Sequence, residues 1–510
     1  MTSNGNSGAA ASATTHADDQ PIKTGNGNVP GNHGHQPQGN TLLGLTDDCD
    51  FWHDASRTAF VSFPVSGHRE HWGVRSREFK MWLSGQFYAT TAGAIRGQAI
   101  EDAIRILEAR AVNANPEYEP FIRVGHRSGK LYLDLCDASW RAVEITTDSW
   151  RVIQTPPIKL VRSPSMRPLP EPEAGSLIEE LRNFLNVGDD QDFMLVVAWL
   201  VAALRPRGPY PILVVNGGQG SGKSVFCRML RLLVDPSAAP IRAAPKDDRD
   251  LVVSAGNSWA LAFDNLSKVD GCLSDGLCRL ATGGGFATRM LHTDRDEMIF
   301  EGQRPIVLNG IPLLTERADL ADRAITVHLR AIPDDERLPE DALWHQFEQA
   351  RPRILGALLD AVSAALRHIA NVRLDRSPRM ADFVKWITAA EPGLGWDDGA
   401  FLIAYRDNRR SVSDLAFDAD SVAGAIRDLM ATRYPDGWEG TATQLLTEIN
   451  ELTADSIRKV RSWPLTAQAL GNRIERVAPL LRTQGFVVER RHSTFRRISI
   501  FPDRGIGAQQ

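Results

Sequence analysis

The chain has 510 residues, of which 43% are hydrophobic and 24% are charged, and its net charge is −5. This length predicts two to four domains with a sizeable core, and the balance is that of an ordinary water-soluble protein. The acidic total excludes overall basicity as a means of binding nucleic acid, so any basic surface has to be local.

The cysteine spacing and the apolar runs restrict the class of protein further. The five cysteines are scattered and form neither a C-x-x-C pair nor a metal-like spacing with histidine. This pattern predicts reduced thiols, a cytoplasmic location and no disulfide framework. The longest apolar run, residues 193–204, is too short to span a membrane and predicts a buried helix, so no membrane partner is expected.

The first third of the chain predicts a tail, an accessory domain and a linker. Residues 1–40 consist mainly of small and polar residues, which predicts a disordered tail. Residues 41–162 mix helical and strand periods and predict an N-terminal α+β accessory domain without chemistry of its own. Residues 163–175 are rich in proline and predict an extended linker.

Two features of the accessory domain have a functional alternative. Asp134 and Asp137, with His126 upstream, invite comparison with the metal carboxylates of archaeo-eukaryotic-type primases, but their spacing differs and acids at strand ends explain them better. The aromatic-rich residues 69–88 could touch nucleic acid or a neighbouring subunit, although aromatic residues at such positions are more often core. The expected elements are a helix over 97–112 and short strands within 129–137, 140–146 and 149–155.

A glycine-rich stretch supplies the first strong motif. Residues 214–226 read VVNGGQGSGKSVF and fit the spacing G-x-x-x-x-G-K-[ST], with an apolar run before them and a helix-compatible run after them. Such a strand–loop–helix unit places backbone N–H groups around phosphate oxygens at a helix N-terminus. We therefore expect ATP and Mg²⁺ here, with Lys223 reaching the β/γ-phosphates and Ser224 holding the metal. The residues expected to contact the nucleotide are Gly217, Gly218, Gln219, Gly220, Ser221, Gly222, Lys223, Ser224 and Val225.

The second motif is an acid at the end of an apolar strand. Residues 258–265 read SWALAFDN, and Asp264 stands where an acid can hold Mg²⁺ through water. A buried strand that ends in a turn aspartate is the alternative for this segment taken alone. Its distance from the glycine-rich stretch favours the metal role, so Ser224 and Asp264 are the expected metal residues.

Residues 277–310, LCRLATGGGFATRMLHTDRDEMIFEGQRPIVLNG, read as a helix, a glycine turn, a hairpin and a strand that ends in Asn309. With this order of motifs the chain resembles the superfamily 3 helicases, especially the helicase halves of phage, plasmid and satellite-element primase-helicases. The resemblance implies a P-loop, AAA+-like core over residues 176–335, in which Asn309 touches the γ-phosphate or the attacking water. It also implies that the hairpin contacts DNA in the pore of a ring, with Arg289, His292 and Arg295 in or near it.

The chain departs from that family at two places. The family commonly has two acids at the end of the metal strand, whereas Asn265 follows Asp264 here. The family's Gly-Gly-Asp is replaced by three glycines, residues 283–285. The first departure leaves the catalytic base open: either Asp264 serves both roles or hydrolysis is slow.

The resemblance also implies an arginine that acts on the neighbouring subunit's nucleotide. Arg323 opens an apolar strand in the place where related ring ATPases carry such a finger, and Arg317 is the alternative. A local ion pair of Arg323 with Asp319 or Asp322 is the simpler interpretation. The expected catalytic set is thus Lys223, Asp264, Asn309 and Arg323.

The C-terminal part supplies the basic surface that the whole chain lacks. Residues 336–437 predict a helical region, and residues 438–505 predict helices followed by a two-stranded hairpin, as in a winged helix. Between residues 458 and 505 there are eleven Lys or Arg residues against three Asp or Glu residues. Duplex DNA is the expected partner, although a winged-helix scaffold can also serve protein contacts. The expected phosphate contacts are Arg490, Arg491, Arg496 and Arg497.

Taken together, these patterns predict an α/β ring ATPase. Its expected partners are DNA and further copies of the same chain, which would assemble into a homo-hexamer. ATP hydrolysis would drive movement on DNA, with single-stranded DNA in the pore and duplex at the C-terminal domain, and whether a separate primase acts with it stays open. One alternative is an ATP-dependent DNA-binding switch that separates no strands. Another is a P-loop phosphotransferase, against which Asn309, Arg323 and the basic C-terminal region argue.

Overall fold

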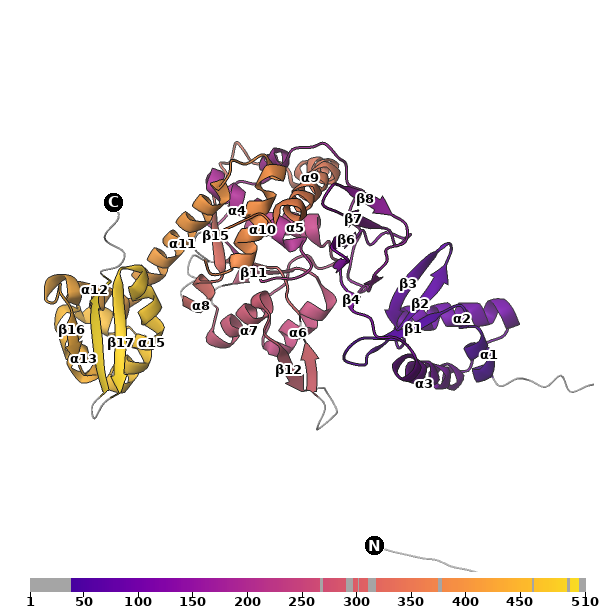
Figure 1. The fold of residues 1–510 in the computed structure, drawn as a ribbon, viewed down its shortest axis with the longest axis horizontal. Helices are drawn as coiled ribbons and strands as arrows, with labels where there is room; N and C mark the ends of the chain where they lie inside the picture. The colour runs from indigo at the N-terminus through magenta and orange to yellow at the C-terminus, as the bar shows by residue number, and fades with distance from the viewer. Residues whose placement is uncertain are drawn as a thin grey trace, which may run out of the picture.

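The computed structural model describes residues 38–266, 269–289, 297–300, 302–310, 318–374, 378–460, 463–492 and 496–503. These residues form a mixed α/β structure, in which an N-terminal part and a C-terminal part flank a central sheet with its helices (Figure 1). None of the helices in the described part of the chain is both long and apolar enough to cross a membrane.

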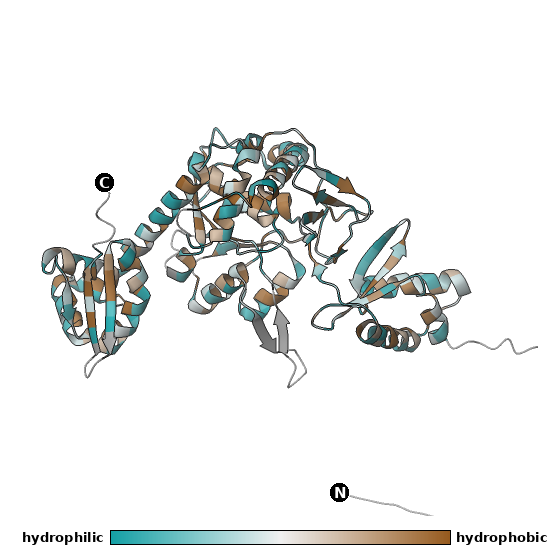
Figure 2. Cartoon of the chain, viewed as in Figure 1, coloured by the Kyte–Doolittle hydropathy of each residue, from teal (hydrophilic) through white to brown (hydrophobic). Residues whose placement is uncertain are grey.

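The N-terminal part is a three-stranded antiparallel sheet packed against helices. Its elements are α1 (Gln38–Gly44), β1 (Asp50–His53), β2 (Ala59–Val65), β3 (His68–Gly73), α2 (Arg77–Thr91) and α3 (Gly97–Ala114). Hydrophobic and hydrophilic residues alternate along α2 and α3 (Figure 2). Phe79 of α2 is fully buried, as expected for a core residue. The expected tail is too long by three residues, because α1 begins at Gln38 and buries Leu42 against this core. The rest of that tail lies outside the described residues.

A second antiparallel sheet follows and contains the three strands expected from the sequence. Its order is β5 (Val124–Arg127), β6 (Lys130–Asp134), β7 (Ala142–Ile145) and β8 (Trp150–Ile153), and β4 (Pro120–Phe121) pairs separately with β9 (Lys159–Leu160). Leu133 and Val143 of this sheet belong to the same buried cluster as the helices of the central part. The expected domain boundary at residue 162 therefore does not coincide with a break in the core.

The proline-rich segment was expected to be an extended linker; it begins with a turn, in which the Met166 N–H donates to the Ser163 carbonyl at 3.0 Å, and it is packed rather than free. The Leu169 N–H donates to the Leu135 carbonyl at 2.9 Å, and the Glu173 N–H donates to the Pro352 carbonyl at 3.0 Å. Leu169 is also part of the central core. A short 3₁₀ helix, η1 (Ile178–Phe184), then leads into the central part. The segment thus fixes the second sheet to the central part instead of separating the two.

The central part is a four-stranded parallel sheet with helices on both faces. The strands, in the order of the sheet, are β11 (Leu261–Leu266), β14 (Ile306–Gly310), β10 (Ile212–Gly217) and β15 (Ala324–Leu329). Its helices are α4 (Asp190–Ala203), α5 (Lys223–Val234), α6 (Asp248–Asn257), α7 (Gly271–Thr282), α8 (Ala318–Ala321), α9 (Glu340–His368), α10 (Ala381–Leu394) and α11 (Ala400–Ala419). The strands are apolar and almost fully buried, as is typical of parallel strands covered on both faces.

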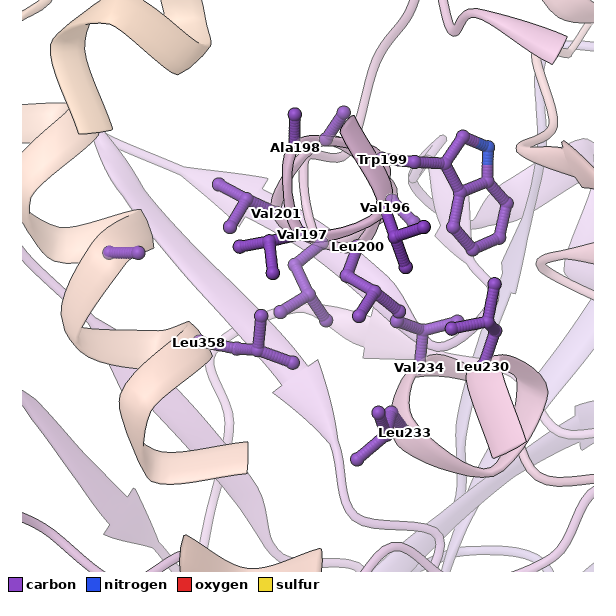
Figure 3. Packing of buried hydrophobic residues seen from close by; sticks show 14 of the residues in the cluster. Val196, Val197, Ala198, Trp199, Leu200, Val201, Leu230, Leu233, Val234 and Leu358 are labelled. Atoms are coloured by element: carbon purple, nitrogen blue, oxygen red, sulfur yellow. The ribbon is translucent and has the colours of Figure 1, made fainter. Parts of the chain in front are cut away.

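The apolar run at residues 193–204 forms most of α4, which confirms the expected buried helix. Figure 3 shows Leu200 on the side of this helix that faces Val234 of α5, and Val197 on the side that faces Leu358 of α9. Because α5 follows the glycine-rich loop directly, this packing anchors the helix that supports the loop. An antiparallel hairpin, β12 (Phe286–Arg289) with β13 (Glu297–Phe300), projects from the lower edge of this part (Figure 1).

The C-terminal part contains the expected helices and hairpin, but it begins earlier than residue 438. Its elements are α12 (Ser421–Thr432), β16 (Trp438–Gly440), α13 (Ala442–Leu452), α14 (Asp455–Arg458), α15 (Ala467–Thr483), β17 (Phe486–His492) and β18 (Arg496–Pro502). The sheet order is β16-β18-β17, all antiparallel. Ile426 and Leu429 of α12 lie in one buried cluster with Leu470 and Ile500, so α12 belongs to this part rather than to the helical region before it.

Candidate functional site

The candidate site lies where three parallel strands end side by side. The glycine-rich loop joins β10 to α5, and Gly220 and Gly222 take φ values of 80° and 75°, which favour glycine. Asp264 ends the regular part of β11, and Asn309 lies near the end of β14. Because carboxyl ends of parallel strands share one edge, the structure brings these predicted residues together around the loop.

Lys223 and Ser224 open α5 from inside the loop. Lys223 Nζ donates to the Gly217 and Gly218 carbonyls, at 2.8 Å each. No side chain caps the start of α5, whose N-cap is Gly222. Free N–H groups at such a helix start, together with an ammonium group, form an arrangement suited to an anion.

The two residues expected to hold a metal are in direct contact. Ser224 Oγ donates to Asp264 Oδ1 at 2.9 Å, with Oδ2 at 3.2 Å. A hydroxyl and a carboxylate are oxygen ligands of the kind that Mg²⁺ prefers, and Mg²⁺ needs few protein ligands when a substrate supplies others. Among the residues that the structure describes, no three His, Cys, Asp or Glu side chains gather into a metal-binding group.

Asn309 lies beside the loop and bonds two groups of the fold. Its side chain is 1% exposed, its Oδ1 accepts from the Asn265 backbone N–H at 2.8 Å, and its Nδ2 donates to Cys227 Sγ at 3.3 Å. Burial raises the pKa of the Cys227 thiol to about 12, so this partner stays neutral. Asn309 thereby holds the turn after Asp264, where Asn265 has a φ of 56° and faces solvent.

Sequence reasoning missed Asn186, which precedes α4. Its Nδ2 donates to the Ser221 carbonyl in the loop and to the Arg330 carbonyl after β15, at 2.8 Å each. One amide thus ties the loop to the segment that follows β15. No local pattern marks Asn186, because its role comes from two contacts that are distant in the chain.

Asp192, in the first turn of α4, bonds the backbone near the carboxyl end of β15, beside the loop. Its Oδ2 accepts from the His328 N–H at 2.9 Å, and His328 pairs in register with Asn216 of β10. Burial raises the pKa of Asp192 to about 6, and the bonds from the His328 and Gly188 N–H groups oppose that rise. This carboxyl group therefore fixes the ends of β15 and β10 beside the loop.

Arg323 lies at the opposite end of the sheet, where the parallel strands begin. In register, Ala324 pairs with Ile212 at the start of β10, whereas Leu329 pairs with Gly217 at the loop. Six residue steps of strand, roughly 20 Å, therefore separate Arg323 from the loop of its own chain. Arg317 lies outside the described residues.

The local contacts of Arg323 differ from the expected ion pair. Arg323 Nη1 donates to the Asp319 backbone carbonyl at 2.8 Å. The Asp322 carboxylate accepts instead from Arg379 at 2.6 Å and from Arg409 at 2.8 Å. Two further arginines, which the sequence did not single out, thus lie close to Arg323.

Two of the four C-terminal arginines, Arg490 and Arg497, have described side chains, and both bond within the C-terminal part. In register, Arg490 pairs with Ile498 and Arg491 pairs with Arg497. Arg490 bonds Glu475 and the Gly471 carbonyl of α15, and Arg497 donates to Glu439 at 2.9 Å. The phosphate contacts expected for Arg490 and Arg497 stay predictions.

The remaining expected DNA contacts lie beyond what the structure describes. Arg289 ends β12, and its side chain is not described. His292 and Arg295 lie outside the described residues, as do the side chains of Arg491 and Arg496. Their roles stay predictions.

Asp134, at the end of β6, and Asp137, in the loop after it, have structural partners, as the simpler interpretation expected. Arg162 donates to both oxygens of Asp134, at 2.9 and 2.7 Å, and lies 3.9 Å from the centre of the Trp140 ring. Arg141 Nε donates to Asp137 at 2.6 Å. Both carboxylates are thus neutralised within the fold.

Two family models of known proteins match this chain. Residues 178–418 match the family model for the actinomycete integrative conjugative element replication protein, and residues 422–505 match the model for the AICE RepA C-terminal domain. A search of curated proteins found no match. On these two matches, the chain belongs to a family of mobile-element replication proteins. Its two adjoining matches, which together cover more than half of the chain, are to one kind of protein, AICE RepA.

Two solved structures are distantly similar to this chain. The apo C-terminal region of NrS-1 is 11% identical, covers 91% of this chain and 98% of that chain, and has a TM-score of 0.40. A JCV helicase bound to a small molecule is 13% identical, covers 41% of this chain and 67% of that chain, and has a TM-score of 0.22. Function therefore has to be argued from the site itself.

Proposed function

We propose that the protein is an ATP-dependent motor that moves on DNA during replication of the mobile element. The observation that carries this proposal is the contact between Ser224 and Asp264 beside the glycine-rich loop. A hydroxyl at the start of α5 meets a carboxylate from the end of β11 within one P-loop arrangement. That is the pair of oxygen ligands that holds Mg²⁺ in P-loop ATPases.

The residues present fit Mg·ATP. Lys223 now bonds two neutral carbonyls, and phosphate oxygens would give it stronger, charge-assisted bonds. Gly218 has no neighbouring atom within 4 Å of a Cβ position, so a phosphate can approach the backbone there. A bound Mg²⁺ would neutralise charge on the β- and γ-phosphate oxygens. Ser224 and Asp264 would hold it, directly and through water.

The base that activates water has to be a residue other than the second acid that the family uses. Asn265, in the place of the family's second acid, carries no charge and points to solvent. Asn309, whose two polar groups are engaged, acts as a positioning residue that fixes the backbone after Asp264. Asp264 is therefore proposed to serve as both metal-site acid and base. Asn265 also favours a second candidate, a switch that binds DNA according to its nucleotide and separates no strands.

Assembly follows from the position of Arg323. Because about 20 Å of strand separates it from its own loop, Arg323 is proposed to contribute to hydrolysis at a neighbouring subunit. This supports a ring, proposed as a homo-hexamer, in which Arg323 acts in trans. Arg379 and Arg409, which meet at Asp322, are further basic groups at the same edge.

DNA contact is proposed at two places. The C-terminal order of α12, β16, α13, α15, β17 and β18 is that of a winged helix, in which α15 would face duplex DNA and the hairpin would meet phosphates. The β12–β13 hairpin is proposed to contact single-stranded DNA in the pore. Since Asp134 and Asp137 are both paired with arginines, a primase would be a separate partner.

Replacing Lys223 by alanine tests the nucleotide site. We expect Lys223→Ala to weaken binding of ATP by at least about tenfold, because a charge-assisted bond to phosphate is lost, and to abolish turnover. The measurements are titration with a fluorescent ATP analogue and release of phosphate, with melting temperature as the check of folding. Lys130→Ala is the matched control, because Lys130 pairs with Glu144 in the β5–β8 sheet and is distant from the loop. Normal binding and turnover by Lys223→Ala would exclude a P-loop ATPase.

Strand separation distinguishes the motor from the switch. We expect the wild type to open a forked DNA duplex in the presence of ATP, and Lys223→Ala to leave it closed. The measurement pairs a fluorophore and a quencher on forks of both polarities, with ATP turnover followed in the same tube. An assembled protein that hydrolyses ATP but opens neither fork would be a switch.

A further inference from the structure

The segment after β15 lies against the glycine-rich loop. The Arg330 N–H donates to the Asn186 carbonyl at 3.0 Å, and Arg330 Nε donates to the Val187 carbonyl at 3.0 Å. Asn186 in turn bonds both Ser221 and Arg330. A little further on, Ile332 Cδ1 lies 3.5 Å from the Cβ position of Gly222. Residues 330–337, here called the strap, are thus held at the loop by contacts along their length.

The strap carries a cation onto the loop. Arg337 Nη2 lies 3.2 Å from the Cβ position of Gly220, an exposed residue with a φ of 80°. A larger residue at this position would meet the guanidinium as well as backbone strain. Arg337 therefore approaches the phosphate-binding loop of its own chain, whereas Arg323 lies at the opposite edge of the sheet.

The present contacts of Arg337 are weak. Arg337 Nη1 lies 3.4 Å from Asp334 Oδ1, and the Asp334 side chain is 94% exposed. Arg337 Nε donates to the Ile332 carbonyl at 3.4 Å, near the limit for a hydrogen bond. A solvated surface pair of this kind contributes little, so a phosphate group can displace it. Arginine is also the side chain best suited to binding phosphate, through two parallel N–H donors.

We propose that Arg337 is a second cation of the nucleotide site, donating to phosphate oxygens of a nucleotide bound in the same subunit. This inference rests on the proposed function of the loop. It assigns the site one cation from inside the loop, Lys223, and another from the strap. Asn186 and Ile332 hold the strap so that the guanidinium stays within reach.

Binding measured with ATP, ADP and AMP tests the proposal. We expect Arg337→Gln to weaken ATP binding by about tenfold, as for the loss of a charge-assisted bond, and to weaken AMP binding least. Arg337→Lys keeps the charge without the planar fork and should recover part of the loss. The probe is each nucleotide with Mg²⁺, titrated by calorimetry against the full chain. Arg433→Gln is the matched control, because Arg433 makes a surface pair with Glu451 in the C-terminal part.

The outcomes separate this inference from the function on which it rests. If Arg337→Gln binds ATP within twofold of the wild type while Lys223→Ala has lost it, the P-loop stands and the role of Arg337 is overturned. An equal loss for ATP, ADP and AMP would also overturn it, since the contact would not be with the outer phosphates. If Lys223→Ala keeps full affinity, the nucleotide site itself fails, and this inference fails with it.

Discussion

Asp235→Ala is expected to lower the free energy of unfolding by about 3–5 kcal/mol, the cost of removing one partner from a buried ion pair. Asp235 Oδ1 accepts from Arg123 Nε at 3.0 Å, and Oδ2 lies 3.0 Å from Arg231 Nη1. The three side chains are 0 to 2% exposed. The Trp259 and Ala260 N–H groups also donate to Oδ2, at 2.9 and 3.1 Å. Without this carboxylate, two buried guanidinium groups lose their charged partner and two buried N–H groups lose their acceptor.

The effect should reach the functional site. Asp235 follows the last residue of α5, the helix that begins in the glycine-rich loop. Arg123 belongs to the segment before β5 and also donates to the Asp134 and Arg167 carbonyls, at 3.0 Å each. The carboxylate therefore joins the second sheet and the proline-rich segment to the central part. We expect Asp235→Ala to loosen this joint and to weaken nucleotide binding.

Urea denaturation followed by tryptophan fluorescence, together with calorimetry, measures the change. Asp418→Ala is the control, because Asp418 is 69% exposed and lies 3.7 Å from Arg427. The control should change stability by no more than about 0.5 kcal/mol. A loss of less than about 1 kcal/mol for Asp235→Ala would contradict a tightly coupled buried network.

Gly356→Ala is expected to destabilise the protein by about 3 kcal/mol or more, because the added methyl has no space. A Cβ on Gly356 of α9 would lie 1.7 Å from the Glu173 carbonyl oxygen, a backbone atom. Glu173 cannot easily move away, since its N–H is bonded to the Pro352 carbonyl of the same helix. The proline-rich segment would have to leave α9.

A glycine in another helix provides the matched control. Gly424 of α12 has no neighbouring atom within 4 Å of a Cβ position, so Gly424→Ala should be neutral or stabilise by roughly 0.5–1 kcal/mol. Calorimetry measures stability, and limited proteolysis within residues 163–175 reports whether the segment has detached. If Gly356→Ala melts like the wild type and resists the protease, the close approach of Glu173 to α9 is wrong.

Local patterns were enough for much of the fold. A period of two residues marked β6, β7 and β8, a helical period marked α3, and the unbroken apolar run marked α4 as buried. The spacing of Gly217, Gly222, Lys223 and Ser224 placed the loop between a strand and a helix. These features follow from residues close together in the chain, and such periods and turn preferences are local properties.

Contacts between distant segments could not be derived in this way. Arg162 pairs with Asp134, and Arg123 pairs with Asp235. Because these pairs join the second sheet to the central part, the core has no break at the expected domain boundary. Asn186 and Arg337 reach the loop from either side of it in the chain. Nothing in the sequence near these residues indicates their partners, because the partners are chosen by packing.

The amino-acid sequence by itself determined that this chain has a glycine-rich loop with Lys223 and Ser224, an acid at the end of a later strand, and a basic C-terminal region. The tertiary structure alone decided that Ser224 meets Asp264, that Asn309 holds the backbone beside them, and that Arg323 lies at the far edge of the sheet. The physical reason is the range of each interaction. Periodicity and backbone preference act over a few residues, whereas strand order and side-chain direction arise only when the whole core is packed.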